Sequence, residues 1–440
     1  MSQKTASTQD VLLQRGGIPP IGKAIPLALQ HVVAMVVGCI TMPMVIAGAA
    51  GVSAGDQIIM VQASLLVAAL AILLHAFGKK GLISSGLPVM IGSGFAFLPT
   101  LQSVVKTDGM AGMLGAQVAG AVLGIVVGLC FKKIRFLFPP IVTASVVVTI
   151  GISLYDTAVN YMAGGNKAAE TYGSPMNWAL ALITLITVIL CGQFGKGMVK
   201  ASATLIGMVV GYIAAACMGQ IHFDSVGTAA WVQLPEPLHF GLTFNLSAVV
   251  SLGVVFMVNA VQDIGQFEAT ANGVCERPAE NGEVTGGVIA NNLCSLLGGL
   301  LGGSPVATAG QNVGIVVTTR VINRIVFGIA GGVVLVSALV PKLSAILITI
   351  PQPVLGGATI TVFGSIAMTG VRMLARDGLS NRSVFIAGLS VALAVGIPQT
   401  AGAFQACPAW VGQILGSSEV IIVAISAILL NLILPKEKKS

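Results

Sequence analysis

Charge is what this sequence has least of. Asp, Glu, Lys and Arg make up 8% of the 440 residues, whereas a soluble globular domain carries about a quarter. No long polar block separates the apolar segments, which excludes a separate soluble domain of ordinary composition. With a mean hydropathy of +0.95, the chain is expected to be an all-α, polytopic membrane protein whose main surroundings are the lipid bilayer.

The motifs of metal and redox chemistry are missing as well. Four histidines occur without a His-Glu-x-x-His pair, and seven cysteines occur without Cys-x-x-Cys spacing. We therefore expect no metal and no cofactor, and we interpret the cysteines as small packing residues. No nucleophile–base pair and no continuous polar pore lining is evident, which argues against an intramembrane enzyme or a channel. The net charge of +7 is typical of membrane orientation and does not indicate nucleic-acid binding.

Apolar runs of about 20 residues are needed to cross the hydrocarbon core of a bilayer. By this measure the sequence predicts fourteen spans, of which the third and tenth are interrupted by glycine and proline. The predicted spans are 25–46, 56–77, 88–105, 111–131, 136–155, 176–195, 201–218, 246–269, 285–301, 305–323, 325–341, 350–371, 382–398 and 412–435.

The basic residues give the orientation. If both termini are cytoplasmic, nineteen of the 22 Lys and Arg fall on the cytoplasmic side of the fourteen spans. This asymmetry is what the positive-inside rule requires, and one missed span would invert every later loop. The short polar tails further suggest a bacterial inner membrane.

The tenth span cannot be an ordinary membrane helix. Gly302 to Pro305 interrupt helical pairing, and residues 306–309 form a short extended run. Gln311 and Asn312 follow where a helix could restart. Broken backbone at this depth is tolerated where protein buries it or where it lines a cavity, and such breaks mark the substrate sites of secondary transporters. A simple kink or a tight helix crossing is the alternative.

An internal repeat relates the two interrupted spans. Pro140 and Pro353 each open an apolar run and are each followed eleven residues later by glycine. The same offset of 213 residues carries the segment 92–99 onto 305–312. Because each half contains an odd number of spans, we expect two inverted seven-span repeats, with short β-strands in spans three and ten facing each other near the midplane.

The eighth span carries a polar stripe. Asn259, Gln262, Asp263 and Gln266 fall within an arc of about 100° on a helix. Polar groups within a membrane helix are expected to face a cavity or a partner helix. Amides offer both donors and acceptors, which suits a planar ligand with alternating N–H and C=O groups. Hydrogen bonding between helices is the alternative role.

Several other residues are site candidates with an open alternative. Phe95 lies inside the break of the third span and could form an aromatic wall together with Phe97, although lipid-facing or core positions are equally open for Phe97. The pair Gln30 and His31 lies early in the first span, where a single histidine is more often a structural hydrogen-bonding group. Asn291, in the ninth span, has the same two possible roles.

These residues resemble a known family, the nucleobase–ascorbate transporters, also called the second nucleobase–cation symporter family. The family signature is Gln-Asn-x-Gly-x4-Thr followed by Arg or Lys. Its fixed positions are matched here by Gln311, Asn312, Gly314, Thr319 and Arg320. The Gln30-His31 pair, the Phe-Ala-Phe run of the third span and the proline-led twelfth span also resemble family motifs.

The resemblance implies a core domain and a gate domain, with the core carrying the substrate past the gate in an elevator-like motion, commonly in a homodimer. The core domain would consist of spans 1–4 and 8–11, at 25–131 and 246–341. The gate domain would consist of spans 5–7 and 12–14, at 132–245 and 342–435. The cytoplasmic tails would be 1–24 and 436–440.

The resemblance also implies a substrate site. Gln262 and Gln311 would contact the substrate directly, Asn312 would support them, and backbone groups beside the two breaks would complete the site at Gly94, Phe95, Ala309 and Gly310. Glutamine at position 311 resembles the purine branch, with xanthine or uric acid as substrate. Uracil or another base, or an anion carried by the same fold, are the alternatives.

The chain departs from the family pattern where coupling is concerned. Gln262, Gln266 and Asn291 stand at positions that often carry carboxylates in the family. An amide can hydrogen-bond a base but cannot take up a proton. Asp263 is therefore the candidate coupling residue for H⁺ or Na⁺, although a structural pairing of Asp263 or uncoupled transport are also open.

Overall fold

The structure is a computed structural model that describes residues 11–134, 139–221, 223, 226–227, 229–377, 379–400, 402–404, 406–407 and 419–435. The predicted tail 436–440, the first ten residues of the tail 1–24 and the start of the predicted last span therefore lie outside the described residues.

One group of helices includes the eighth to eleventh predicted spans. Within it, α11 and α12 pack extensively on α4, and α14 packs on α3 and α2. Its members are α2 (Ile21–Ala50), α3 (Ala54–Phe77), α4 (Leu98–Ile134), α11 (Leu246–Cys275), α12 (Asn281–Leu301), α13 (Gly310–Thr319), α14 (Arg324–Leu339) and α15 (Pro341–Ile348).

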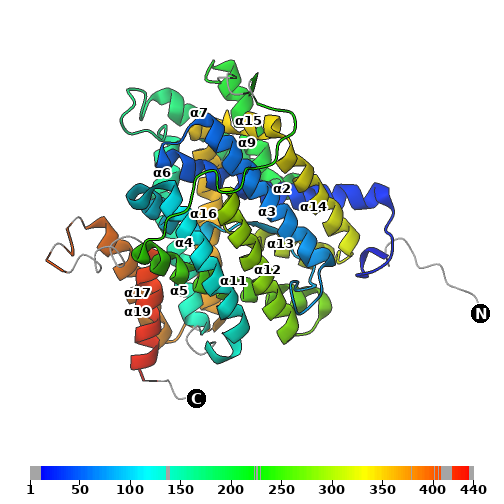
Figure 1. Cartoon of the computed structure of the whole chain (residues 1–440), viewed down its shortest axis with the longest axis vertical. Coiled ribbons are helices and arrows are strands. Elements are labelled where there is room, and N and C mark those ends of the chain that lie inside the picture. Colours follow the sequence, from blue (N-terminus) through cyan, green and yellow to red (C-terminus); the bar gives the residue numbers. More distant parts are fainter. Residues whose placement is uncertain are drawn as a thin grey trace, which may run out of the picture.

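The second group is built around α16, which packs on α5, α6 and α7. Helices α17 and α19 pack on each other and on α5, and lie on the side of the molecule opposite α14 (Figure 1). The members are α5 (Pro140–Ser153), α6 (Tyr155–Met162), α7 (Pro175–Phe194), α8 (Met198–Ala201), α9 (Ala203–Cys217), α16 (Gln352–Asp377), α17 (Asn381–Gln399) and α19 (Glu419–Ile433). Contacts between the two groups are less extensive.

The two predicted breaks form one small antiparallel sheet. Strand β1 (Ile91–Ser93) pairs with β2 (Val306–Thr308), with Gly92 opposite Ala307. The short strands predicted in both interrupted spans are thus confirmed. The single-turn helix η1 (Phe95–Phe97) follows β1 and leads into α4, and α13 follows β2 after the N-cap residue Ala309. Backbone groups of the two breaks bond to each other, and the side chains of Ser295 and Asp263 accept from the backbone N–H groups of Val306 and Thr308. These bonds satisfy backbone groups that the bilayer could not.

The count of long membrane helices is lower than the predicted number of spans. Among the described residues, nine helices are long and apolar enough to cross a membrane, or ten if α14 and α15, bent by 81°, form one span. Helix α4 contains the end of the third predicted span and the whole of the fourth. It consists of two helical parts that meet at a kink at Gly109, where the φ of 70° and the ψ of −175° are not helical. The predicted boundary between these two spans falls at this kink.

The cysteines only partly follow the prediction. Cys39 and Cys294 are buried and act as small core residues. Cys130, Cys217 and Cys407 are exposed on the surface of the described chain, so the predicted packing role is wrong for these three. Apolar surroundings in the sequence do not distinguish a face toward the core from a face toward lipid, because both are apolar in a membrane helix.

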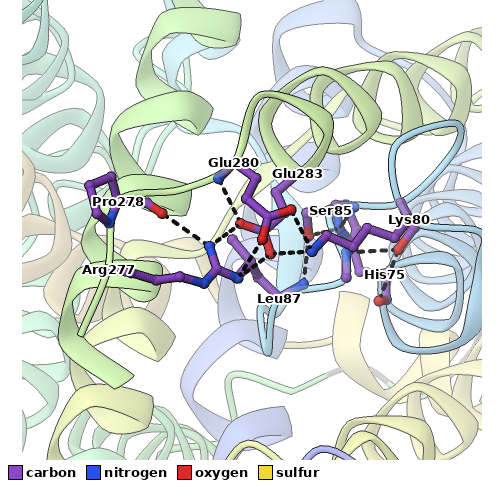
Figure 2. A network of polar contacts seen from close by, with 10 residues as sticks. His75, Lys80, Ser85, Leu87, Arg277, Pro278, Glu280 and Glu283 are labelled. Atoms are coloured by element: carbon purple, nitrogen blue, oxygen red, sulfur yellow. Dashed lines mark hydrogen bonds and ion pairs between the residues drawn. The ribbon is translucent and has the colours of Figure 1, made fainter. Parts of the chain in front are cut away.

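An ion cluster fastens the start of α12 to the end of α3. The carboxylate of Glu283 is buried and accepts bonds from both terminal nitrogens of Arg277, at 2.8 and 2.7 Å. The ammonium of Lys80 lies 3.1 Å from Glu283 and 2.9 Å from Glu280. Glu280 is the N-cap of α12 and forms a capping box with Glu283. Figure 2 shows Arg277 and Lys80 reaching the two carboxylates from opposite sides.

Candidate functional site

A cavity of about 430 Å³ lies between the two groups of helices. This volume falls in the range of small-molecule sites, roughly 300–1,000 Å³. One wall comes from α2, the two breaks and α11, and the other comes from α5, α8, α9 and α16. The two breaks, which were predicted to meet, therefore both line one cavity.

Three amides of the α11 stripe face this cavity. Asn259, Gln262 and Gln266 belong to its lining. The buried Oδ1 of Asn259 and the buried Oε1 of Gln262 find no hydrogen-bond partner among the described residues. A buried acceptor without a donor costs about 1–3 kcal/mol, so both amides gain if they turn toward a ligand that offers N–H groups.

The fourth member of the stripe, Asp263, points elsewhere. It is fully buried outside the cavity lining. Its Oδ1 accepts from the backbone N–H of Thr308 at 2.7 Å, and its Oδ2 accepts from the side-chain amides of Asn291 at 2.8 Å and Asn259 at 3.2 Å. This carboxylate ties β2 to α11 and α12. The geometry matches the structural pairing that the sequence left open for Asp263.

The backbone of the two breaks forms the end of the cavity nearest the sheet. The predicted positions Gly94, Phe95, Ala309, Gly310 and Gln311 all line it. The α13 helix begins here with Gly310, and its first N–H groups have no partner one turn earlier, so this end favours partial negative charge on a ligand.

The two aromatic residues of the third span have different roles. Phe95 lines the cavity, and its ring meets the buried Phe363 of α16 edge-on, with 5.4 Å between centroids. Phe97 is fully buried against Phe256, with 4.5 Å between centroids. Phe97 is therefore a core residue, which was one of the alternatives the sequence left open, and it does not extend the aromatic wall.

Besides Asp263, four more predicted site residues lie outside the lining. Asn312 is buried behind Gln311, and its Oδ1 lies 2.7 Å from Nδ1 of His31. His31 is thus a structural hydrogen-bonding group on α2. Asn291 donates from Nδ2 to Asp263, and its Oδ1 lies 3.0 Å from Nε2 of His75 on α3. Gln30 is half-buried and does not line the cavity, so the structure does not bring it to the site.

Several lining residues were not predicted from the sequence. Arg372, Thr369 and Ser365 of α16 line the wall opposite the breaks, with Lys200 of α8 and Thr204 of α9. Their positions follow from how the second group of helices is rotated against the first, for which the sequence carries no local signal. No Asp or Glu belongs to the lining formed by the described residues. The part of the chain that the structure describes contains no cluster of His, Cys, Asp and Glu that could hold a metal.

Comparison with known sequences places the chain among transport proteins. A sequence model described as "Permease family" matches residues 22–402. The chain is 34% identical over 416 residues to the uric acid permease PucJ of Bacillus subtilis, covering 93% of this chain and 92% of the relative. It is 32% identical over 458 residues to the xanthine permease XanP of Escherichia coli, covering 100% and 98%.

The fold itself resembles solved membrane transporters. The transmembrane domain of the cyanobacterial bicarbonate transporter BicA superposes with a TM-score of 0.62 at 16% identity, covering 92% of this chain and 98% of that domain. The SLC26A9 structure gives a TM-score of 0.63 at 13% identity, covering 94% of this chain and 65% of that one. At such identities the likeness concerns the fold alone.

Proposed function

Because the chain belongs to the Permease family, that of the nucleobase–ascorbate transporters, and is therefore a transporter and not an enzyme, we propose that it carries a purine base across the membrane, with xanthine or uric acid as substrate. The observation that carries this proposal is the cavity between the two groups of helices, which presents amides and an aromatic ring and has a size suited to a small molecule. The relatives named for uric acid and xanthine support the same substrate class.

The cavity suggests how a flat heterocycle is held. Its ring stacks on Phe95. The free Oε1 of Gln262 accepts a ring N–H, and the amide of Gln311 binds a second edge. The N–H groups at the start of α13 bind a carbonyl oxygen. Asn312, held by His31, positions Gln311 without touching the substrate.

The placement of the cavity also supports alternating access by an elevator-like motion. The first helix group, which includes the sheet of the two breaks, is the proposed core, and the group around α16 is the proposed gate. The β1–β2 pairing makes both breaks move together with the core, and the less extensive contacts between the groups suit sliding of one past the other. The fourteen-span count and the inverted repeat belong to this proposal.

Orientation and assembly are proposed on the same basis. Lys200 and Arg372, which line the cavity, were both assigned to the cytoplasmic side by the charge asymmetry, so the described conformation would open inward in a bacterial inner membrane with both termini cytoplasmic. Only 22% of the residues in the apolar stretches of α7 and α17 are buried, and a homodimer would cover part of this surface.

Uptake of radiolabelled uric acid and xanthine into proteoliposomes tests the function. We expect Gln262→Ala and Gln311→Ala to abolish uptake or change its specificity while protein levels stay normal. Gln30→Ala is the matched control, because Gln30 is an amide in a membrane helix that does not line the cavity. Wild-type uptake by both site variants would remove the site assignment. Competition by bicarbonate or sulfate, and not by bases, would favour an anion transporter instead.

Imposed gradients test coupling in the same vesicles. We propose that import is driven by an ion, H⁺ or Na⁺. Accumulation of the base above its external concentration, only under an inward gradient of one of these ions, is the expected result. Equilibration without accumulation under either gradient would mean uncoupled transport.

A further inference from the structure

The charged residues that line the cavity are all basic. Lys200 and Arg372 belong to its lining, and no described Asp or Glu does. Resting on the proposed function, we propose that the site binds its purine as the monoanion, the form that has lost one ring N–H proton, in preference to a neutral base. Uric acid meets this condition at neutral pH, whereas hypoxanthine is neutral there.

The polar inner wall suits an anion. Asn259, Gln262 and Gln266 are uncharged amides. A carboxylate at any of these positions would repel a bound anion, because two like charges in a partly desolvated cavity interact more strongly than they do in water. An amide instead donates through its NH₂ group, and a purine that has lost a proton presents more acceptors and fewer donors. The unpartnered Oε1 of Gln262 accepts the ring N–H that the monoanion retains.

The buried carboxylate behind this wall does not oppose the anion directly. Asp263 lies outside the lining and accepts from the backbone N–H of Thr308 and from two side-chain amides. These donors are directed at its oxygens and offset its charge locally. The start of α13, which opens into the cavity at Gly310, adds a partial positive charge on the substrate side.

The two cations lie on the proposed gate side, on different elements. Lys200 is on α8, and Arg372 is on α16, where its Nη2 donates to Oγ1 of Thr369 at 3.0 Å. Neither is an ion-pair partner of any described carboxylate. Both are exposed at the cavity, so their contribution is long-range attraction and a modest binding increment.

Binding of two probes at one pH tests the proposal. We would measure dissociation constants of purified wild-type protein for uric acid and for hypoxanthine at pH 7.5, at low and high salt. We expect the wild type to prefer uric acid, and only uric acid binding to weaken with salt. Arg372→Gln and Lys200→Gln should each weaken uric acid binding by about fivefold and leave hypoxanthine nearly unchanged.

Matched controls and a charge insertion sharpen the test. Arg376→Gln and Lys196→Gln remove neighbouring cations of α16 and of the segment before α8 that do not line the cavity, so both should bind like the wild type. Gln262→Glu should weaken uric acid binding at least tenfold and shift preference toward hypoxanthine.

The outcomes separate the two proposals. Equal effects of Arg372→Gln and Lys200→Gln on both bases, or a wild-type preference for hypoxanthine, would overturn the anion proposal while leaving purine transport intact. Absence of binding and uptake of every purine by the wild type would overturn the proposed function itself.

Discussion

The Nδ1 atom of His31 lies 2.7 Å from the Oδ1 atom of Asn312, although 281 residues separate them in the chain. Both side chains are buried, and the His31 ring also packs on Phe327 with 4.9 Å between centroids. Because Oδ1 can only accept, the imidazole donates from Nδ1. This bond joins the first membrane helix to the first turn of α13, next to the proposed substrate-binding residue Gln311.

We expect His31→Leu to lower uptake strongly, since it leaves the oxygen of Asn312 without a donor in a buried position, at a cost of about 1–3 kcal/mol. His31→Gln keeps an N–H donor and should restore a substantial part of the activity. Uptake normalised to the amount of protein in the membrane is the measurement. Equal activity of the two variants would show that the hydrogen bond does not position Gln311.

Substitution of Asp263 separates an anchoring role from a coupling role. Asp263→Asn places an NH₂ group among three donors, so we expect β2 to lose its attachment and transport to fall in every assay. The measurement is exchange of labelled for unlabelled base across the membrane, which needs no driving ion. Normal exchange combined with lost accumulation would instead identify Asp263 as the coupling residue.

Two glycines at equivalent places in the predicted repeat should respond differently to alanine. A Cβ at Gly151 of α5 would clash with the backbone nitrogen of Ala367 on α16. A Cβ at Gly364 would meet no described atom within 4 Å. We expect Gly151→Ala to destabilise the protein by about 1–3 kcal/mol through overpacking, and Gly364→Ala to be tolerated. Thermal unfolding in detergent gives the comparison, and equal melting temperatures would contradict the close approach of α5 and α16.

The ion cluster at the start of α12 should contribute to stability. Glu283→Gln removes the charge that Arg277 and Lys80 share, and we expect a loss of about 2–3 kcal/mol, because the carboxylate is buried and its hydrogen bonds are charge-assisted. Glu276→Gln is the control, since Glu276 is 72% exposed and lies 3.4 Å from Arg320. The measurement is the stability of both variants against unfolding in detergent. It shows whether the buried charge of Glu283 contributes more than the exposed charge of Glu276.

The pH dependence of this cluster has a definite sign. The hydrogen bond with Glu280 raises the pKa of Lys80, and the hydrogen bond with Glu283 raises the pKa of Arg277. A raised pKa means that the stabilisation is complete below the pKa of the unfolded chain and is lost as the pH rises through the folded value. The effect of Glu283→Gln on the melting temperature should therefore be constant around neutral pH and shrink in strongly alkaline buffer. It should also shrink in acid, because the effect of burial is outweighed by the hydrogen bonds from Arg277, which lower the pKa of Glu283 to about 2.

The parts of the site that local rules govern could be predicted from the sequence. Gly302 to Pro305 cannot continue a helix, so the sequence predicted the break in the tenth span. It also predicted that a helix could begin again where Gln311 stands. Helical periodicity placed Asn259, Gln262 and Gln266 on one stripe, and all three line the cavity. Periodicity could not separate Asp263 from them, because a 100° arc is wide enough to face both a cavity and a neighbouring helix.

The remaining parts depend on how helices are rotated and tilted against one another. Arg372 and Lys200 were assigned to a membrane surface by counting charges, but the rotation of α16 and the placement of α8 decide that they line the cavity. In the same way, no pattern in the sequence distinguished Gln30, which does not line the cavity, from the amides of α11 that do. In a membrane protein, apolar faces toward lipid and toward protein look alike.

The absence of described Asp and Glu side chains from the cavity lining affects how the membrane potential acts on the protein. An empty cavity that carries cationic side chains and no carboxylate holds positive charge of its own, whereas a cavity loaded with a monoanion holds less. A membrane potential does about 2.3 kcal/mol of work per elementary charge per 100 mV. If the core carries the bound monoanion through the bilayer field while Lys200 and Arg372 stay with the gate, voltage acts differently on the loaded and the empty carrier. The potential would thereby set which half of the cycle limits turnover.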